Sequence, residues 1–445
     1  MGECMNDTLA APAVQQPAAS PRPLGLWSAT ALVVGSMIGS GVFLLPASLA
    51  PYGASSLLGW GVTLCGAVLL ALTFARLVRR WPRTGGPYVF AREGFGDAAG
   101  FIVAWSYWVS VWCGTAAIAV AFAGSIGAVW PPLTATPVRA AACALGGLWL
   151  CSAINLAGMR EAGRMQVATT VLKLLPLLLF GGVALWFVDA SHYTPFNPSG
   201  ESLPNAVQAT VALTLWGFLG LEAATIPAGA IRDAERTVPR ATVLGTLLAG
   251  LATILACTAV LGLLPADVVK SSQAPMADAA RGLWGSAAGI GIALVATVSC
   301  LGALNGWVLI SAQVPFAAAR DGLMPKAFAR ENANGSPAFG VIASSTLASL
   351  LVLSNYSHSL VQLFTFSILL STAATLLPYV VSTAAWLRRG ERKGRMVAAL
   401  ALLYSLYALL GTGRESLLWG AGLLVAGVPV YALQRWRANP TTTQT

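Results

Sequence analysis

Charged side chains are scarce in this sequence. Asp, Glu, Lys and Arg make up 9% of the 445 residues, against roughly a quarter in a typical soluble protein, which argues against a soluble domain. The apolar residues fall in long runs, among them 60–78, 242–264 and 286–312, and about 18 such residues suffice to cross the membrane as a helix. These runs lack the alternation of barrel strands, so the sequence predicts an all-α membrane protein.

Histidine and paired cysteine motifs are also lacking. The two histidines, His192 and His358, fall in predicted outer loops, and the seven cysteines form no CxxC or Cys/His cluster. This pattern argues against a disulfide framework and a metal site. It also argues against an intramembrane enzyme, which would need a Ser/His, paired-Asp or HExxH arrangement. We therefore expect no enzyme activity, metal or cofactor, although a membrane sensor that binds without transporting stays open.

The net charge of +10 reflects topology rather than nucleic-acid binding. Most of the Lys and Arg residues lie in alternate short loops, and the intervening loops hold only Arg139, Lys270, Arg281 and Arg414. Because basic residues mark the cytoplasmic side, we expect about twelve spans with both termini in the cytoplasm. We also expect the chain to lie in a bacterial inner membrane as a multi-pass protein, in contact with lipids and with no nucleic acid.

The spans are punctuated by Pro and Gly. Residues 1–23 read as a disordered cytoplasmic tail, the first span as an uncleaved signal anchor, and 86–96 as a segment along the inner surface. The predicted spans are 25–50, 55–78, 97–129, 138–157, 163–188, 205–231, 240–264, 285–320, 338–355, 360–387, 395–412 and 415–435. A second cytoplasmic tail is predicted at 437–445.

Spans 1 and 6 are interrupted by glycines. Gly35 to Gly41 contains three glycines in seven residues, and Trp216 to Glu222 contains two. These segments occupy corresponding positions if spans 1–5 and 6–10 are two repeats, and such breaks are typical of transporter binding sites. Close helix packing is the simpler alternative, because small residues also let helices approach.

A break at mid-membrane frees backbone N–H groups at the start of the outer half-helix, where the helix dipole is positive. The amides of Ser40 and Gly41 can therefore hold a carboxylate, and the Ser40 hydroxyl adds a donor. Glycine allows the ligand to approach the backbone closely. The sequence therefore predicts a site for the carboxylate of an amino acid at this break.

Two ionisable residues are predicted to lie deep in the membrane. Glu222 is the one acidic residue placed beside a mid-span break, and an intramembrane carboxylate is a candidate for function, here proton exchange. A structural, uncharged Glu222 is the alternative. Lys173 lies within span 5; its charge either takes the place of a coupling cation against carbonyls of the first span or pairs with Glu222. Trp216 borders the second break, and aromatic faces attract ammonium and guanidinium groups.

Four motifs together resemble the amino acid/polyamine/organocation superfamily and, within it, the basic amino acid/polyamine antiporter family that exchanges arginine for agmatine. They are Gly39-Ser40-Gly41 with Val42-Phe43-Leu44-Leu45-Pro46, then Thr84-Gly85-Gly86-Pro87-Tyr88, then Trp216 with Glu222, then Asp321-Gly322-Leu323. The similarity covers nearly all of residues 24–436. It implies twelve helices, with a five-plus-five inverted repeat (24–200 and 201–390, spans 1 and 6 broken) and a homodimer formed through 391–436.

The resemblance also implies the residues of the site, between spans 1, 3, 6, 8 and 10. Trp216 and Trp307 would stack on the substrate, Ser371 would contact its polar parts, and Glu222 would couple protons to movement. The expected substrate-binding residues are Met37, Gly39, Ser40, Gly41, Tyr107, Ser110, Val111, Thr115, Ile118, Trp216, Leu219, Trp307 and Ser371. The expected gating and proton-coupling residues are Glu222, Lys173, Tyr379 and Tyr88, with Tyr107 also a gate.

Three positions depart from that antiporter pattern. The family has asparagine where this chain has Thr115, and methionine near Ile118; the asparagine helps to recognise a guanidinium. Lys173 replaces a small apolar residue and resembles the span-5 lysine of proton-coupled permeases. We therefore expect exchange of a basic amino acid for its decarboxylated amine, as with arginine and agmatine, and keep proton-coupled uptake of neutral amino acids as the alternative.

Overall fold

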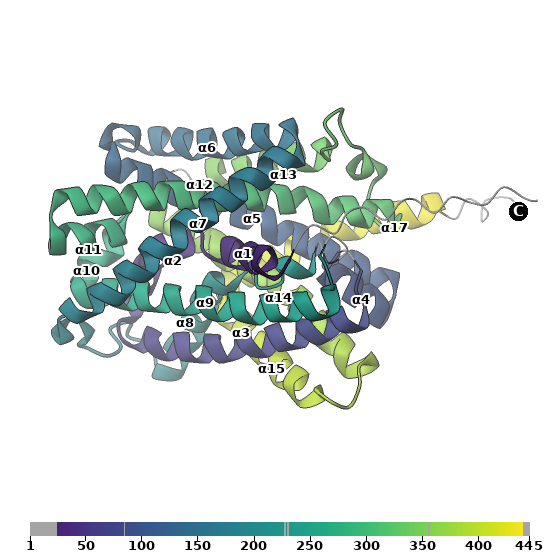
Figure 1. The fold of residues 1–445 in the computed structure, drawn as a ribbon, viewed down its shortest axis with the longest axis horizontal. Coiled ribbons are helices and arrows are strands. Elements are labelled where there is room, and N and C mark those ends of the chain that lie inside the picture. Colours follow the sequence, from purple (N-terminus) through teal and green to yellow (C-terminus); the bar gives the residue numbers. More distant parts are fainter. Residues whose placement is uncertain (1–24, 84, 227, 229–230, 355–356, 439–445) are drawn as a thin grey trace, which may run out of the picture.

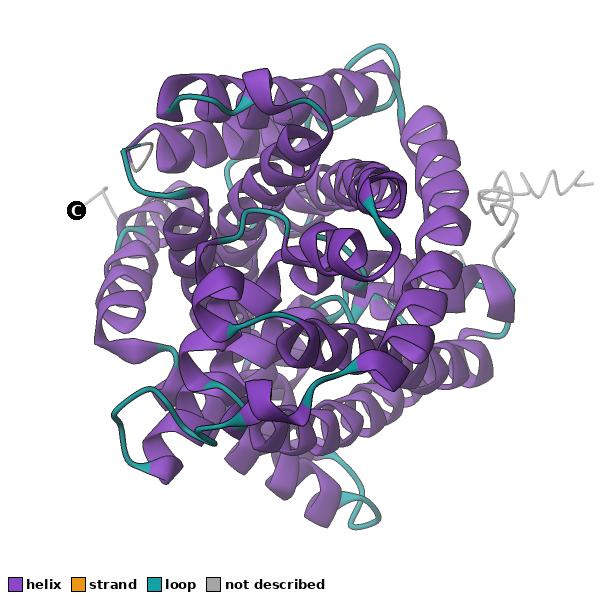
Figure 2. Ribbon diagram, turned by 90° about the vertical axis from the view of Figure 1, so that its left-hand side faces the viewer, coloured by secondary structure: helices purple, strands orange, loops and turns teal. Residues whose placement is uncertain are grey.

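The chain folds as a bundle of helices. The computed structural model describes residues 25–438, except 84, 227, 229–230 and 355–356, and for 159–171 it describes the backbone alone. Throughout these residues it contains helices and loops and no strand (Figure 2). The all-α prediction is confirmed. The predicted tail at 1–23 lies outside the described residues.

Twelve segments correspond to the predicted spans. In the described chain, eight are long and apolar enough to cross a membrane and three are shorter apolar helices; the half-helix α8 completes the set. The segments are α1 (Leu26–Met37) with α2 (Gly41–Leu49), α3 (Ser55–Arg80), α5 (Asp97–Val129), α6 (Pro137–Ala157), α7 (Met159–Ala184), α8 (Leu203–Leu215), α9 (Ala234–Leu263), α12 (Ser286–Arg320), α13 (Ala338–Ser354), α14 (Leu360–Arg389), α15 (Arg395–Gly411), and α16 (Gly413–Val425) with α17 (Gly427–Ala438).

Shorter helices connect the spans. Between α3 and α5 lies α4 (Pro87–Phe95), where an inner-surface segment was expected, and α10 (Ala266–Ser271) and α11 (Pro275–Trp284) lie between α9 and α12. The last span is divided into α16 and α17, and α17 ends at Ala438, inside the segment predicted as a tail. Figure 1 shows α17 extending away from the bundle toward the C-terminus.

Spans 1 and 6 are both broken, at the predicted places. Helix α1 ends at Met37, Ile38 is extended (φ −80°, ψ 96°), and α2 starts at Gly41. Helix α8 ends at Leu215 and is followed by 3₁₀ turns at Trp216–Phe218 and Ala223–Thr225. Beyond the break, the described residues of span 6 form turns and not a regular α-helix. Gly220, at φ 102°, turns the chain there, a backbone conformation that L side chains rarely adopt.

The interior is organised around α5, which packs on α12 and α14. Helix α1 packs between α7 and α9 near the middle of the bundle (Figure 1). The packing is reciprocal between the two halves of the chain. The contact of α1 with α9 is matched by that of α8 with α3, and the contact of α5 with α14 by that of α12 with α7. The two breaks therefore lie in equivalent surroundings.

Candidate functional site

The break in span 1 presents unpaired donors. Ser40 precedes α2, and its hydroxyl is buried (1% exposed) and has no hydrogen-bond partner among the described residues. Its carbonyl accepts from the amides of Phe43 and Leu44, both at 3.2 Å. The amides at the start of a helix have no acceptor within that helix. The start of α2 therefore combines a free hydroxyl with backbone donors at the positive end of a dipole.

Two small cavities adjoin this break, and both are lined by Ser36, Leu219 and Trp307. The first reaches the helix break and is further lined by Met37, Gly39, Ser40, Gly41, Ile118 and Trp216. The second is further lined by Tyr107, Ser110, Val111, Gly220, Glu222, Ile310 and Thr375. Each has a volume of about 10 Å³, the space of one water molecule. Neither cavity therefore has room for an amino acid in this conformation.

Two tryptophans form the wall of the first cavity. The rings of Trp216 and Trp307 are 5.2 Å apart at 46°, and Trp216 meets Phe364 edge-on at 6.5 Å. The Trp307 indole N–H donates to the carbonyl of Ser36 at 3.4 Å. Gly114 leaves room for that ring, because a Cβ there would overlap it. Trp307 thus stands between the helix break and the second cavity.

Glu222 lines the second cavity and is buried at 2% exposure. One carboxylate oxygen accepts from the Tyr107 hydroxyl at 2.7 Å, and the other accepts from the Tyr379 hydroxyl at 2.6 Å. These bonds join span 6 to α5 and α14, so they hold three spans together beside the second cavity.

The two breaks are in contact. A Cβ at Gly220 would lie 2.8 Å from the Cβ of Ser36, so the glycine lets the second break approach the end of α1. Donors of the first break and the carboxylate after the second therefore line two neighbouring cavities that share Ser36, Leu219 and Trp307. Within the described residues, no cluster of three or more His, Cys, Asp or Glu side chains could hold a metal ion.

Comparison with known proteins shows the family to which the chain belongs. Residues 24–425 match the family model described as amino acid permease. The chain belongs to the amino acid permease family. This permease is a multi-pass membrane transporter and not an enzyme.

Three relatives cover most of the permease. A putative arginine/ornithine antiporter of Bacillus subtilis is 32% identical over 92% of this chain and 96% of its own. An arginine/ornithine antiporter of Pseudomonas aeruginosa is 33% identical over 93% and 91%, respectively. A cadaverine/lysine antiporter of Escherichia coli is 32% identical over 82% and 83%. The permease is therefore similar along its length to antiporters of basic amino acids and amines.

Lys173 contacts the first span and not Glu222. Its ammonium group is buried at 1% exposure and donates to the carbonyl of Gly35 at 2.6 Å. Gly35 lies in the last turn of α1, where carbonyls lack partners within the helix. Lys173 was expected either to contact carbonyls of the first span or to pair with Glu222. The structure shows the contact with a carbonyl of the first span.

Five expected residues, all of them described, line neither cavity: Lys173 and Tyr379, whose contacts are given above, and Thr115, Ser371 and Tyr88. The Thr115 hydroxyl donates to the carbonyl of Val111 one turn earlier at 2.7 Å, and the Ser371 hydroxyl donates to the carbonyl of Ser110 at 2.7 Å. Tyr88 donates to Asp321 at 2.8 Å, away from Glu222. The hydroxyl groups of Thr115, Ser371 and Tyr88 each donate a hydrogen bond to another protein oxygen instead.

Four cavity residues were not predicted. Ser36 lies in the interrupted segment of span 1 and lines both cavities. Gly220 lies in the interrupted segment of span 6 and lines the second cavity. Ile310 follows Trp307 by three residues and Thr375 follows Ser371 by four, the spacing of one helical turn. That spacing was the available signal, since residues one turn apart share a helix face. It does not say which face turns toward the break.

Proposed function

We propose that this permease exchanges a basic amino acid for another basic amino acid or for a decarboxylated amine such as agmatine. The supporting observation is the pairing of two ends: unpaired donors at Ser40 and Gly41, and the buried Glu222 carboxylate beyond Trp307. An extended substrate with a carboxylate at one end and a cation at the other matches both ends. Trp216 and Trp307 offer aromatic faces to its chain.

The substrate pair is supported by the relatives, whose names give arginine, ornithine, lysine and cadaverine as exchanged compounds. Agmatine follows from the resemblance of the motifs. Thr115 turns its hydroxyl to its own helix, so this position offers no group like the asparagine that helps to recognise a guanidinium. We therefore include compounds with a terminal amine, such as ornithine and lysine, among the candidates.

We propose alternating access between two inverted repeats, 24–200 and 201–390. The reciprocal packing of α1 with α9 and α8 with α3 supports this division. Spans 1, 2, 6 and 7 would rock against the other spans and open the two cavities to one side of the membrane at a time. Glu222 would bind a proton during this movement, because its two tyrosine partners lie on the opposing set of helices.

The membrane placement belongs to the same proposal. We place the chain in a bacterial inner membrane. The distribution of Lys and Arg puts both termini on the cytoplasmic side. A homodimer would form through 391–436, where α15 and α16 expose Leu403, Leu410, Trp419 and Val425. This apolar surface also suits lipid, so the dimer rests on the resemblance.

Proton-coupled uptake of neutral amino acids is the second candidate. It is favoured by the contact of Lys173 with the Gly35 carbonyl, because an ammonium there can take the place of a coupling cation. A lysine that gains and loses a proton at this position would link a proton gradient to movement of the first span. Thr115, which replaces the asparagine of the antiporter pattern, favours the same candidate.

Transport by the purified protein in liposomes separates the two candidates. We expect labelled arginine to enter liposomes loaded with arginine, ornithine, lysine or agmatine at least tenfold faster than liposomes loaded with buffer. Alanine inside would not support uptake, and a pH gradient would not replace the internal substrate. Uptake driven by a pH gradient into unloaded liposomes, with alanine competing, would instead establish proton-coupled uptake of neutral amino acids.

A further inference from the structure

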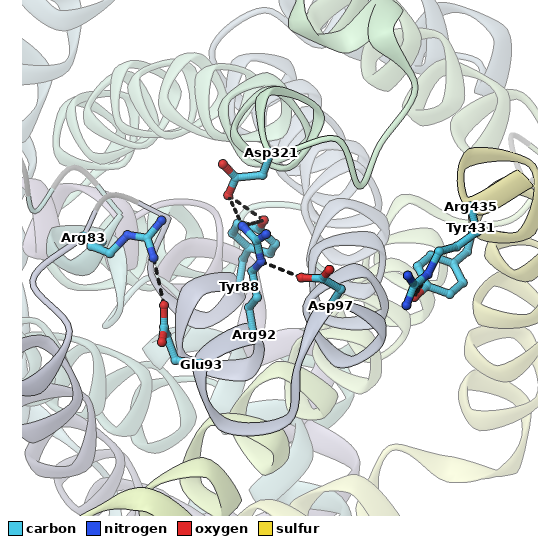
Figure 3. Close-up of polar contacts among 8 residues, drawn as sticks. All are labelled: Arg83, Tyr88, Arg92, Glu93, Asp97, Asp321, Tyr431 and Arg435. Carbon is cyan, nitrogen blue, oxygen red and sulfur yellow. Dashed lines mark hydrogen bonds and ion pairs between the residues drawn. The ribbon is translucent and has the colours of Figure 1, made fainter. Parts of the chain in front are cut away.

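Two motifs of the resemblance have no part in the cavities. The segment Gly85-Gly86-Pro87-Tyr88 leads into α4, and Asp321-Gly322-Leu323 follows α12. They are separated by more than two hundred residues in sequence, yet they meet on the face that the basic loops mark as cytoplasmic (Figure 3). Their contact raises the question of what it holds together.

Arg92 of α4 lies at the centre of this contact. Its guanidinium donates to Asp97 at the start of α5 at 2.8 Å and to Asp321 at the end of α12 at 2.8 Å. The Tyr88 hydroxyl donates to the same Asp321 oxygen at 2.8 Å (Figure 3). We name Tyr88, Arg92, Asp97 and Asp321 the inner network. It joins three elements that come from both halves of the chain.

The inner network also connects to the broken sixth span. The amide of Gly85 donates to the carbonyl of Ile226 at 3.0 Å, just past the second break. Gly86 has φ 55°, and a Cβ there would lie 2.7 Å from the Thr225 hydroxyl. Thr225 in turn donates to the carbonyl of Glu222 at 2.7 Å. Helix α4 is therefore attached to the segment after Glu222 on one side and to α12 on the other.

The ionic contacts are the part of the network suited to opening. Burial, and then the bond to Asp321, raise the pKa of Tyr88, so this hydroxyl keeps its proton and its bond at physiological pH. The side chains of Arg92 and Asp321 are 29% and 35% exposed. Partly exposed ion pairs are weak enough to break and re-form during a conformational change.

We propose that Arg92 is a positioning residue for the cytoplasmic exit, which holds α4 and the segment after Glu222 against the end of α12. Movement of the substrate to the cytoplasm requires the Arg92–Asp321 contact to break. The inference rests on the proposed function, in which this face is cytoplasmic and span 6 moves against α12. Removing the Arg92 charge shifts the population toward the conformation that is open inward.

The test measures access to the second cavity from each side of the membrane. Ser110 lines that cavity, so a Ser110→Cys reporter is placed in full-length protein whose seven native cysteines are replaced by serine or alanine. An impermeant thiol reagent is then added to inside-out and to right-side-out vesicles. We expect Arg92→Gln to raise labelling from the cytoplasmic side roughly three- to tenfold, the effect of losing a few weak contacts.

Three further variants make the result specific. Asp321→Asn should act as Arg92→Gln does, and the double variant should label no faster than either single variant, because both remove one contact. Arg92→Lys, which keeps a charge, should label at an intermediate rate. Arg83→Gln is the matched control. It breaks the Arg83–Glu93 pair, 2.8 Å long and also on this face (Figure 3), which does not involve α12.

Equal labelling of Arg92→Gln and Arg83→Gln would overturn the proposal, as would additive effects of the Arg92 and Asp321 variants. Elution of each purified variant as a single peak in gel filtration shows that it is folded, with Arg92→Lys deciding the matter where Arg92→Gln aggregates. A failure of the proposed function is distinguishable. In that case the parent protein does not exchange basic amino acids, whereas the difference in labelling is read independently.

Discussion

Replacing Glu222 with glutamine is expected to lower the rate of arginine exchange about ten- to a hundredfold. The carboxylate accepts a short hydrogen bond on each oxygen, from Tyr107 and Tyr379. A glutamine keeps one acceptor and places an NH₂ group against the other hydroxyl. Losing a buried bond to a charged group costs roughly 1.5–3 kcal/mol, and about 1.4 kcal/mol is a factor of ten. The same substitution should remove the dependence of the rate on pH.

The measurement is exchange by reconstituted protein over a range of pH. Glu391→Gln is the matched control, because Glu391 lies exposed between α14 and α15; it should exchange like the unaltered protein. Tyr379→Phe removes one of the two bonds and leaves the carboxylate, so its rate should fall less. A Glu222→Gln protein with the normal rate and the normal pH profile would show that this carboxylate is only structural.

Replacing Gly41 with alanine is expected to weaken arginine binding about ten- to a hundredfold. A Cβ at this position would lie 2.9 Å from the Trp216 ring, so the ring or the start of α2 must shift. The shift would displace the first amides of α2 from the carboxylate. The loss of one hydrogen bond to a charged group has about this size.

Calorimetry on purified protein measures this change. Gly61→Ala, on α3, is the control, because a Cβ there meets no described atom within 4 Å. We expect it to leave the dissociation constant unchanged. Agmatine lacks a carboxylate, so its binding should suffer less than that of arginine from Gly41→Ala. Equal losses for both compounds would argue against a carboxylate at this break.

Some of the site could be predicted from residue types and spacing alone. The breaks at Gly39 and Gly220 were identified because glycines cluster at corresponding places in two spans, and the deep Glu222 because an acid is unusual in an apolar span. The bonds of Glu222 could not be derived in this way. Its partners lie 115 and 157 residues away in the sequence, and Tyr107 and Tyr379 were named through the resemblance.

The remaining differences are local in origin. Thr115 was expected to face the substrate, but a serine or threonine inside a helix can donate to a carbonyl four residues earlier, and Thr115 does so. Tyr88 was grouped with Glu222, whereas it contacts Asp321. The sequence pattern placed α4 on the inner surface but could not say which helix end lay beneath it. Side-chain direction and long-range contact are the two properties that periodicity does not report.

A structure determined with bound arginine tests the central claim most directly, that the break in span 1 binds the carboxylate. We predict the carboxylate within about 3 Å of the amide of Gly41 and of the Ser40 hydroxyl. We also predict the Trp307 ring moved away from the Ser36 carbonyl, so that the two cavities join. A carboxylate placed elsewhere, with the Ser40 hydroxyl still unpaired, would contradict this account.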